Sequence, residues 1–243
     1  MKNIFITLFF LVSMDALAQT KRILIVSTNI DEINNAPNGT FLMEIAYPFD
    51  VFKKAGYEVD IVTPKGGKAA VYHRGELVGE LSEIIGSSLF IQKTEHTLSP
   101  EQASQYRYVG IFYPGGGGQF YDVVENQAIA VLARNIYEQG GVSGTAGHGP
   151  VSLVNIKLSD GSFLVKDKKI TCFPKANSAK WLPLDWEKLL HQRGAEVVLP
   201  VTDIEKDKGI QLSAHRIISG SYAENAAWVA TEMISLINKT TTR

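Results

Sequence analysis

The stretch SGTAGHGPVSLV, residues 143–154, has the pattern of a sharp corner between a buried strand and a helix. Enzymes use such corners to hold a nucleophile at the tip, in a strained backbone conformation with positive φ. The residue at the tip here is Gly147, which has no side chain that attacks a substrate. Because glycine adopts positive φ without strain, the pattern predicts a corner that has kept its turn and lost its nucleophile.

Two other side chains could transfer protons in an active site. Glu44 lies beside apolar residues of the first predicted helix, where a carboxylate is either buried and protonated or exposed at the helix edge. His148 directly follows the tip of the corner, where a histidine is better placed than most to face a pocket, although a lone histidine is more often structural. Glu44 and His148 are therefore a candidate acid–base pair.

A cluster of glycines, YPGGGG at residues 113–118, follows a predicted strand. Glycines at a strand end bring backbone N–H groups close to an anion, and they also serve a tight strand-to-helix turn. The cluster matches neither GxxxxGK[ST] nor GxGxxG at the start of a helix. Nucleotide binding is therefore not predicted.

No other nucleophile stands at the tip of the corner. Cys172 lies inside an apolar predicted strand, where a cysteine packs as a small hydrophobic residue. Ser143 and Thr145 precede the tip, and Ser152 lies a turn into the following segment. The five histidines lack the spacing of metal ligands, so we expect neither a metal nor a cofactor.

Hydrophobic patterning predicts a βαβ unit near the start of the chain. RILIVST, residues 22–28, has the continuous apolar character of a strand covered on both faces. Apolar residues at helical spacing follow over 41–55, Gly56 ends that helix, and a second strand covers 57–64. Later strands are expected at 106–113, 141–146, 168–173, 195–200 and 216–220, and later helices at Tyr121–Gln139, 182–194 and 222–238.

This alternation predicts a doubly wound, flavodoxin-like α/β sandwich with a parallel sheet. Sites in such folds lie at the carboxyl ends of the strands, where Glu44, the glycine cluster and the corner are expected to meet. Residues 65–100 are less regular and are expected to form an insertion, which the sequence does not identify as a lid.

The N-terminus predicts export. Lys2 precedes an apolar run at residues 4–12, and Ala16 and Ala18 supply the small residues of a cleavage site. We therefore expect a signal peptide at residues 1–18 and a single domain at 19–243, in a secreted or periplasmic protein. A net charge of −1 favours neither nucleic acid nor an anionic membrane as partner, and one cysteine excludes an internal disulfide.

Taken together, these residues resemble the ThiJ/PfpI superfamily, which has the fold of class I glutamine amidotransferases, and within it the chaperone and glyoxalase III group. The resemblance covers about Arg22 to Asn238. The segments that carry it are MEIAYPFDVFKKAGYEVDIVTPKGG, YPGGGG, GHGP, LSDGSFLVKDKKITCF and LPLDWEKLLHQRGAEVV.

The resemblance implies a set of site residues. In active members a cysteine at the corner is the nucleophile, the adjacent histidine assists it, and a glutamate of the first helix contacts the thiol. By position these correspond to Gly147, His148 and Glu44, with the backbone amides of Gly116 and His148 as the oxyanion site. Family members often form dimers, so a homodimer is expected.

Three departures from the family pattern bear on activity. Gly147 removes the nucleophile, and Gly117 stands where the family has a histidine. Chaperone-like members also place an acidic residue after the corner to orient the histidine, but here that segment is FPKANSAKW, with Asn177, Ser178 and Ala179. Losing a nucleophile that acts with its histidine as a unit costs on the order of 10⁶ in rate.

Three functions follow as hypotheses. The first is an exported pseudoenzyme that binds a small carbonyl, carboxylate or peptide-like ligand, or a client protein. The second is a glyoxalase III-like lyase, or a hydrolase of amidase type, that uses Glu44 and His148 without a covalent intermediate and converts methylglyoxal to lactate. The third is a purely structural or oligomer-forming protein, in which neither residue matters beyond stability.

Overall fold

The computed structural model describes residues 20–241, so the predicted signal peptide at 1–18 lies outside the described residues. A six-stranded sheet with the order β11-β12-β8-β7-β1-β5 forms its centre. All neighbouring strands are parallel except β11 and β12, which are antiparallel. The strands are β1 (Arg22–Val26), β5 (Glu58–Val62), β7 (Tyr108–Tyr113), β8 (Val142–Ala146), β11 (Gln211–Ala214) and β12 (Ile217–Gly220).

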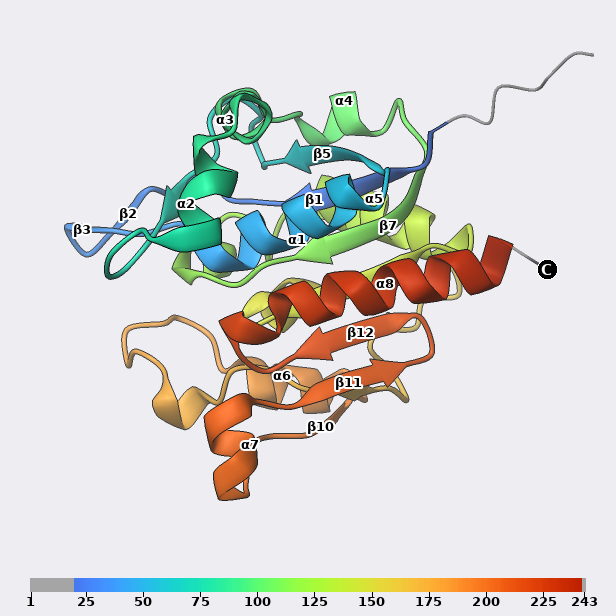
Figure 1. The fold of residues 1–243 in the computed structure, drawn as a ribbon. Coiled ribbons are helices and arrows are strands. Elements are labelled where there is room, and N and C mark those ends of the chain that lie inside the picture. The colour runs from blue at the N-terminus through green and yellow to red at the C-terminus, as the bar shows by residue number, and fades with distance from the viewer. Residues whose placement is uncertain (1–19, 242–243) are drawn as a thin grey trace, which may run out of the picture.

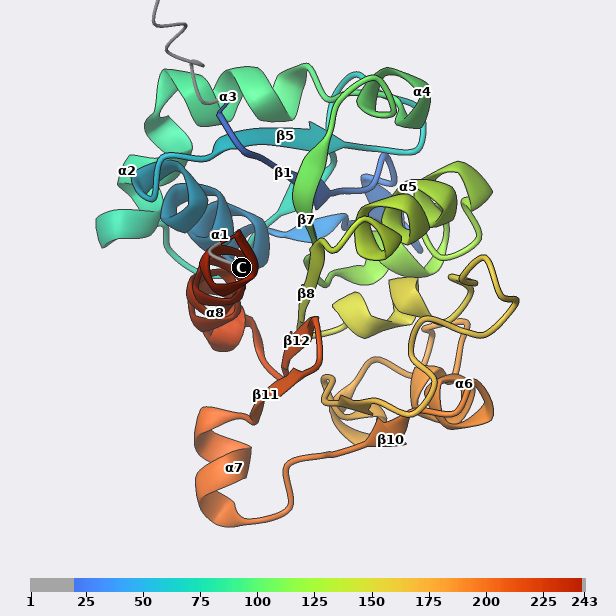
Figure 2. The same ribbon diagram turned by 90° about the vertical axis from the view of Figure 1, so that its right-hand side faces the viewer.

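Helices cover both faces of this sheet, as Figure 2 shows with the sheet seen edge-on. On one face lie α1 (Leu42–Lys54) and α8 (Ala226–Thr241), which also pack against each other. On the other face lie α5 (Gln127–Glu138) and α6 (Trp186–Gln192). The predicted doubly wound α/β sandwich is thus confirmed.

The continuous apolar strands fit their position between two helical layers. Side chains alternate between the faces of a strand, and in β1 this divides Ile23 and Ile25 from Leu24 and Val26. The first pair packs in the core beneath α1 and α8, and the second pair packs in the core on the α5 side. All four side chains are fully buried.

Several predicted elements are shorter in the structure, among them the strand expected at 195–200, which is reduced to two residues. The helix expected at Tyr121–Gln139 begins only at Gln127, because Asn126 accepts a hydrogen bond from the N–H of Ile129 and caps it. The strand expected at 168–173 is reduced to β9 (Lys169–Ile170), which pairs with β10 (Glu196–Val197) in a separate two-stranded sheet. The antiparallel edge strand β11 was not predicted.

The insertion at 65–100 contains β6 (Val71–Tyr72), α2 (Gly79–Gly86) and α3 (Ser88–Glu95). Strand β6 pairs with β4 (Thr40–Phe41), the short strand that leads into α1. The remaining short elements are β2 (Glu32–Ile33), β3 (Ala36–Pro37), α4 (Pro100–Ala103), α7 (Asp203–Lys208) and the 3-10 turns η1 (Gly117–Phe120), η2 (Gly149–Leu153), η3 (Lys175–Asn177) and η4 (Ala223–Asn225).

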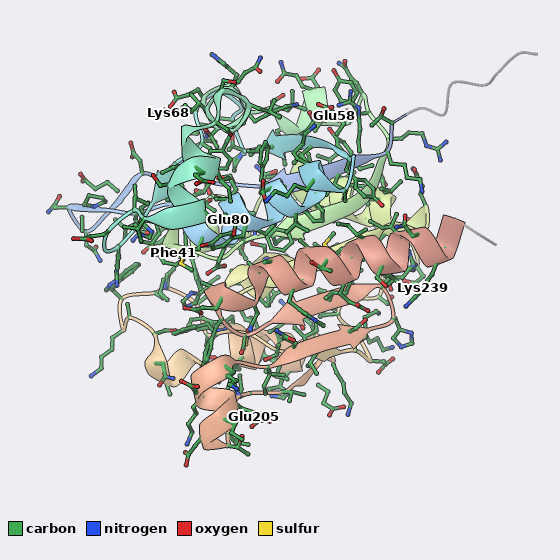
Figure 3. The ribbon with its side chains drawn as sticks, in the orientation of Figure 1. Phe41, Glu58, Lys68, Glu80, Glu205 and Lys239 are labelled. Carbon is green, nitrogen blue, oxygen red and sulfur yellow. The ribbon has the colours of Figure 1, made fainter. Side chains whose placement is uncertain are left out.

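The carboxyl ends of β5, β7 and β12 point to the left in Figure 1. Phe41, at the start of α1, is labelled at that end of the molecule in Figure 3. Residues from several chain segments therefore meet at one end of the sheet. Within residues 20–241, no helix has both the length and the apolar character needed to cross a bilayer.

Candidate functional site

The predicted corner is present, and neighbouring strands fix its backbone. Gly147 follows β8 with a φ of 54°, in the left-handed region. Its N–H donates to the carbonyl of Gly220 at 3.0 Å, and its carbonyl accepts from the N–H of Phe173 at 2.8 Å. The segment after the corner is the 3-10 turn η2 rather than the expected α-helix. The turn therefore holds its tip rigidly at the carboxyl end of the sheet.

The carboxyl group of Glu44 lies where a side chain at the tip would stand. Glu44 is only 4% exposed, so of its two interpretations the buried one is confirmed. An ideal Cβ at position 147 would lie 2.5 Å from Glu44 Oε1 and 2.9 Å from Cδ. These distances are shorter than real Cβ contacts, so the Glu44 carboxyl fills the space that a side chain at position 147 would need.

The environment of Glu44 favours its protonated form. Burial raises its pKa, a hydrogen bond from the Gly115 N–H to Oε2 acts in the opposite direction, and the charge of Glu224 raises it further. The net result is a pKa of about 8. At neutral pH Glu44 is mainly a neutral acid with a proton that it can donate.

His148 is held by three aromatic rings. Its ring centroid lies 4.8 Å from that of Phe173, 5.1 Å from that of Trp186 and 5.6 Å from that of Phe120. Burial in this apolar surrounding lowers the pKa of His148 to about 4. The imidazole is therefore neutral at physiological pH.

Ser178 orients the ring of His148. His148 Nε2 lies 2.9 Å from Ser178 Oγ, which donates its own proton to the carbonyl of Pro174 at 3.0 Å. Ser178 therefore accepts at the histidine, which assigns the ring proton to Nε2. A neutral hydroxyl fixes the tautomer, but it does not stabilise an imidazolium as a carboxylate would. The sequence analysis named Ser178 only as a departure from the family pattern.

Glycine backbone completes the site. Gly116 has a φ of 116°, and a Cβ there would lie 2.2 Å from the carbonyl oxygen of Gly39, so only glycine fits. The N–H groups of Gly116 and His148 donate to no other residue in the part of the chain that the structure describes. Both amides are therefore available as donors to an oxygen of a ligand, as the oxyanion assignment requires.

The space that a side chain at position 117 would need is also occupied by a neighbouring residue. An ideal Cβ on Gly117 would lie 2.4 Å from Oδ1 of Asn38. That oxygen accepts a hydrogen bond from the Gly39 N–H at 2.9 Å, which holds the amide side chain in place. Asn38 thus occupies the start of the path that a longer side chain would take from position 117.

A cavity of about 440 Å³ opens in front of Glu44 and His148. A second chamber of about 170 Å³ shares part of its wall with the first, including Arg74 and His148. Arg74, from the 65–100 insertion, is the one arginine or lysine among the residues that line either chamber. The main cavity is lined by Phe41, Glu44, Tyr72, Arg74, Gly116, His148, Phe173, Asn177, Asp207, Tyr222, Ala223 and Glu224.

The other candidate nucleophiles lie outside this cavity. Cys172 is fully buried in the core on the α5 side, and burial raises the pKa of its thiol, in agreement with the packing role predicted for it. Ser143 and Thr145 are also fully buried, and Ser152 donates to Gln119 Oε1. Among the described residues, no group of three His, Cys, Asp or Glu side chains is arranged to hold a metal ion.

The sequence is similar to known proteins. The profile of the DJ-1/PfpI family matches residues 35–198. A glutathione-independent glyoxalase of Schizosaccharomyces pombe is 28% identical over 155 residues, which are 60% of this chain and 65% of that relative. Glyoxalase 3 of Candida albicans is 28% identical over 161 residues, covering 63% of this chain and 68% of the relative. The chain thus spans about two thirds of the length of these relatives.

Solved structures share the fold. Glyoxalase III from Candida albicans superposes with a TM-score of 0.74 at 23% identity, covering 89% of this chain and 97% of that one. The rapid encystment protein of 24 kDa from Francisella tularensis gives a TM-score of 0.79 at 21% identity, covering 90% and 99%. At this level of identity the similarity establishes the architecture and not the activity.

Proposed function

The chain belongs to the DJ-1/PfpI family, and from that premise we propose that it is an exported, non-catalytic member that binds a small carbonyl- or carboxylate-bearing molecule. The observation that carries the proposal is the Glu44 carboxyl in the space beside Gly147. A site in which only the side chain at position 147 had been removed would have empty space at the tip. Here a neighbouring side chain fills that position and a hydrogen bond from Gly115 holds it there.

The remaining groups suit non-covalent recognition of an oxygen-rich ligand. Protonated Glu44 and the free N–H groups of Gly116 and His148 are donors to a carbonyl oxygen. Arg74 supplies a guanidinium fork for a carboxylate. The cavity also has aromatic walls, including Tyr72 and Phe173, and is larger than a three-carbon molecule needs. We therefore infer a 2-oxo acid with an apolar body as the ligand class.

Replacing Arg74 by Gln tests this ligand class. We expect the wild-type protein to bind phenylpyruvate more tightly than pyruvate in isothermal titration calorimetry, because only the former reaches the aromatic walls. Arg74→Gln is expected to weaken phenylpyruvate binding about tenfold through loss of a charge-assisted pair. Lys68→Gln, which removes an exposed lysine paired with Glu95 outside the cavity, is the charge-matched control. Unchanged affinity in Arg74→Gln would refute carboxylate recognition.

A second candidate function is glyoxalase chemistry without a nucleophile. It is favoured by the names of the curated relatives and by the pKa of about 8 for Glu44, which leaves part of the carboxyl ionised near neutral pH. Water would add to the aldehyde of methylglyoxal, Glu44 would take the proton from C1 of the hydrate, and that proton would return to C2 to give lactate. Neutral His148 would bind the hydrate through Nδ1.

Lactate formation from methylglyoxal separates the two functions. We expect the protein beginning at Gln19 to form no more lactate than its Glu44→Ala and Glu44→Gln variants do. Each variant is to be checked for folding by its thermal unfolding curve. Turnover by the wild type that both variants lose would establish acid–base catalysis by Glu44 and would overturn the non-catalytic proposal.

A further inference from the structure

A second cavity lies on the opposite side of the sheet from α1 and α8, beside α5. Its volume is about 350 Å³, and none of its lining residues belongs to the site at the corner. Figure 2 shows α5, which contributes residues to the lining, and α6, which ends just before the lining residue Arg193, on this face of the sheet. Three cationic side chains line it: Arg134 of α5, Lys157, and Arg193, which follows α6.

These three cations form no salt bridges. None of them forms an ion pair with another residue in the described part of the chain. Glu125 is the one carboxylate in the lining, and its Oε1 accepts a hydrogen bond from Asn155. The carboxylate of Glu138 accepts hydrogen bonds from the N–H and the hydroxyl of Ser159, and the charge of Arg134 helps to lower the pKa of Glu138. The lining therefore carries an excess of two positive charges.

Two of the cations also have buried donors without acceptors. The Nε atoms of Arg134 and Arg193 are shielded from solvent, and neither has a hydrogen-bond partner among residues 20–241. A buried N–H without an acceptor destabilises the folded state. A ligand oxygen in the cavity does not reach these shielded Nε atoms, but Arg134 and Arg193 both line the cavity, and their guanidinium groups offer further donors in the fork geometry that matches an oxyanion.

Phe163 contacts two of the three cations. The Arg193 guanidinium lies 4.6 Å from the centroid of the Phe163 ring, and Lys157 Nζ lies 5.3 Å from the same centroid. Packing on the ring also orders both side chains before a ligand arrives, which reduces the entropy that binding removes.

From these observations we propose that the cavity beside α5 binds the phosphate group of a small phosphorylated organic molecule. A phosphate monoester carries up to two negative charges and three terminal oxygens, which matches the charge excess and the number of cationic groups. Ala130, Val131 and Phe163 line the same cavity and offer apolar surface to the organic part. The site is independent of the 2-oxo acid pocket at the corner.

Calorimetric titration with phenyl phosphate, inorganic phosphate and benzoate tests the proposal. The wild-type protein is expected to bind phenyl phosphate more tightly than inorganic phosphate, and to bind benzoate at least about tenfold more weakly. Arg134→Gln, Arg193→Gln and Lys157→Gln are each expected to raise the Kd for phenyl phosphate about tenfold. Lys68→Gln, which carries the same change in net charge outside the cavity, is expected to leave the Kd unchanged.

Several results would overturn the proposal. These are absence of phenyl phosphate binding at millimolar concentration, equal loss of affinity in Lys68→Gln, or benzoate binding as tight as that of phenyl phosphate. Lys157 is exposed, so Lys157→Gln keeps the test decisive if an arginine variant fails to fold. Phenylpyruvate binding at the corner is measured on the same variants. It is expected to remain at the wild-type level whether or not the cavity beside α5 binds phenyl phosphate.

Discussion

The wild-type protein is expected to lose stability as the pH rises towards 8, and the Glu44→Gln variant is expected not to show this loss. The pKa of Glu44 is about 8 in the folded protein, against a reference value of 4.5. Between these values the folded state binds more protons than the unfolded state, so the free energy of unfolding falls as the pH rises. The full shift corresponds to a loss on the order of 5 kcal/mol.

His148 has the opposite effect, which fixes the pH window for the experiment. Burial lowers its pKa from 6.5 to about 4, so its contribution to stability is present above pH 6.5 and is lost as the pH falls towards 4. Of these two groups, Glu44 is the one whose contribution falls above pH 6.5. In the range from pH 6.5 to 8 the wild type is therefore expected to lose about 2 kcal/mol through this group.

Urea unfolding between pH 6.5 and 8 measures this difference. Glu44→Gln keeps an oxygen that accepts from the Gly115 N–H but cannot ionise, so its stability is expected to lack this loss. Glu80→Gln, a change at the exposed glutamate labelled in Figure 3, is expected to retain the wild-type slope. A Glu44→Gln variant with the wild-type slope would show that Glu44 does not titrate in this range, and its role as a neutral donor would be lost.

Restoring a cysteine at the tip is expected to destabilise the protein and to create no thiol-dependent turnover. In Gly147→Cys a side chain must adopt a φ of 54°, which costs about 1–2 kcal/mol. Its Cβ would also lie 2.5 Å from Glu44 Oε1, so the buried carboxyl must move and lose its bond to Gly115. The backbone strain and the displacement of Glu44 together are expected to lower the free energy of unfolding by roughly 3 kcal/mol.

The Gly140→Cys variant separates backbone strain from crowding by Glu44 as causes of the expected loss of stability. Gly140 has a φ of 93°, and nothing lies within 4 Å of an added Cβ, so this variant reports backbone strain alone. The double variant Gly147→Cys with Glu44→Ala removes the crowding and is expected to recover part of the loss relative to the sum of the single changes. The measurements are urea unfolding and lactate formation from methylglyoxal.

The opposite result would restore the catalytic interpretation of the corner. If Gly147→Cys is as stable as Gly140→Cys, then Glu44 moves aside easily and the nucleophile position is open. If it also forms lactate in a thiol-dependent reaction, only the nucleophile is missing, and the rest of the site retains the geometry that the family resemblance implies.

Local sequence was sufficient to predict the architecture. Continuous apolar runs such as 22–28 indicate strands covered on both faces, and the helical spacing around Phe49 indicates a helix packed on them. Gly147 marked the corner because the turn needs positive φ, which depends on the residue itself and its two neighbours. The length of the helix before the corner was wrong, because the cap at Asn126 competes with helical periodicity.

The content of the site was decided by tertiary structure. Glu44 meets Gly115 across 71 residues, and His148 meets Ser178 across 30. Arg74 reaches the cavity only because β6 pairs with β4 and so brings the insertion to the end of the sheet. Backbone conformation follows from neighbouring residues, whereas the position of a carboxyl, its pKa and its partner depend on which distant segments exclude water from it. The sequence by itself thus determined the fold and the glycine at the tip of the corner, and only the tertiary structure determined which side chain fills the space beside that glycine.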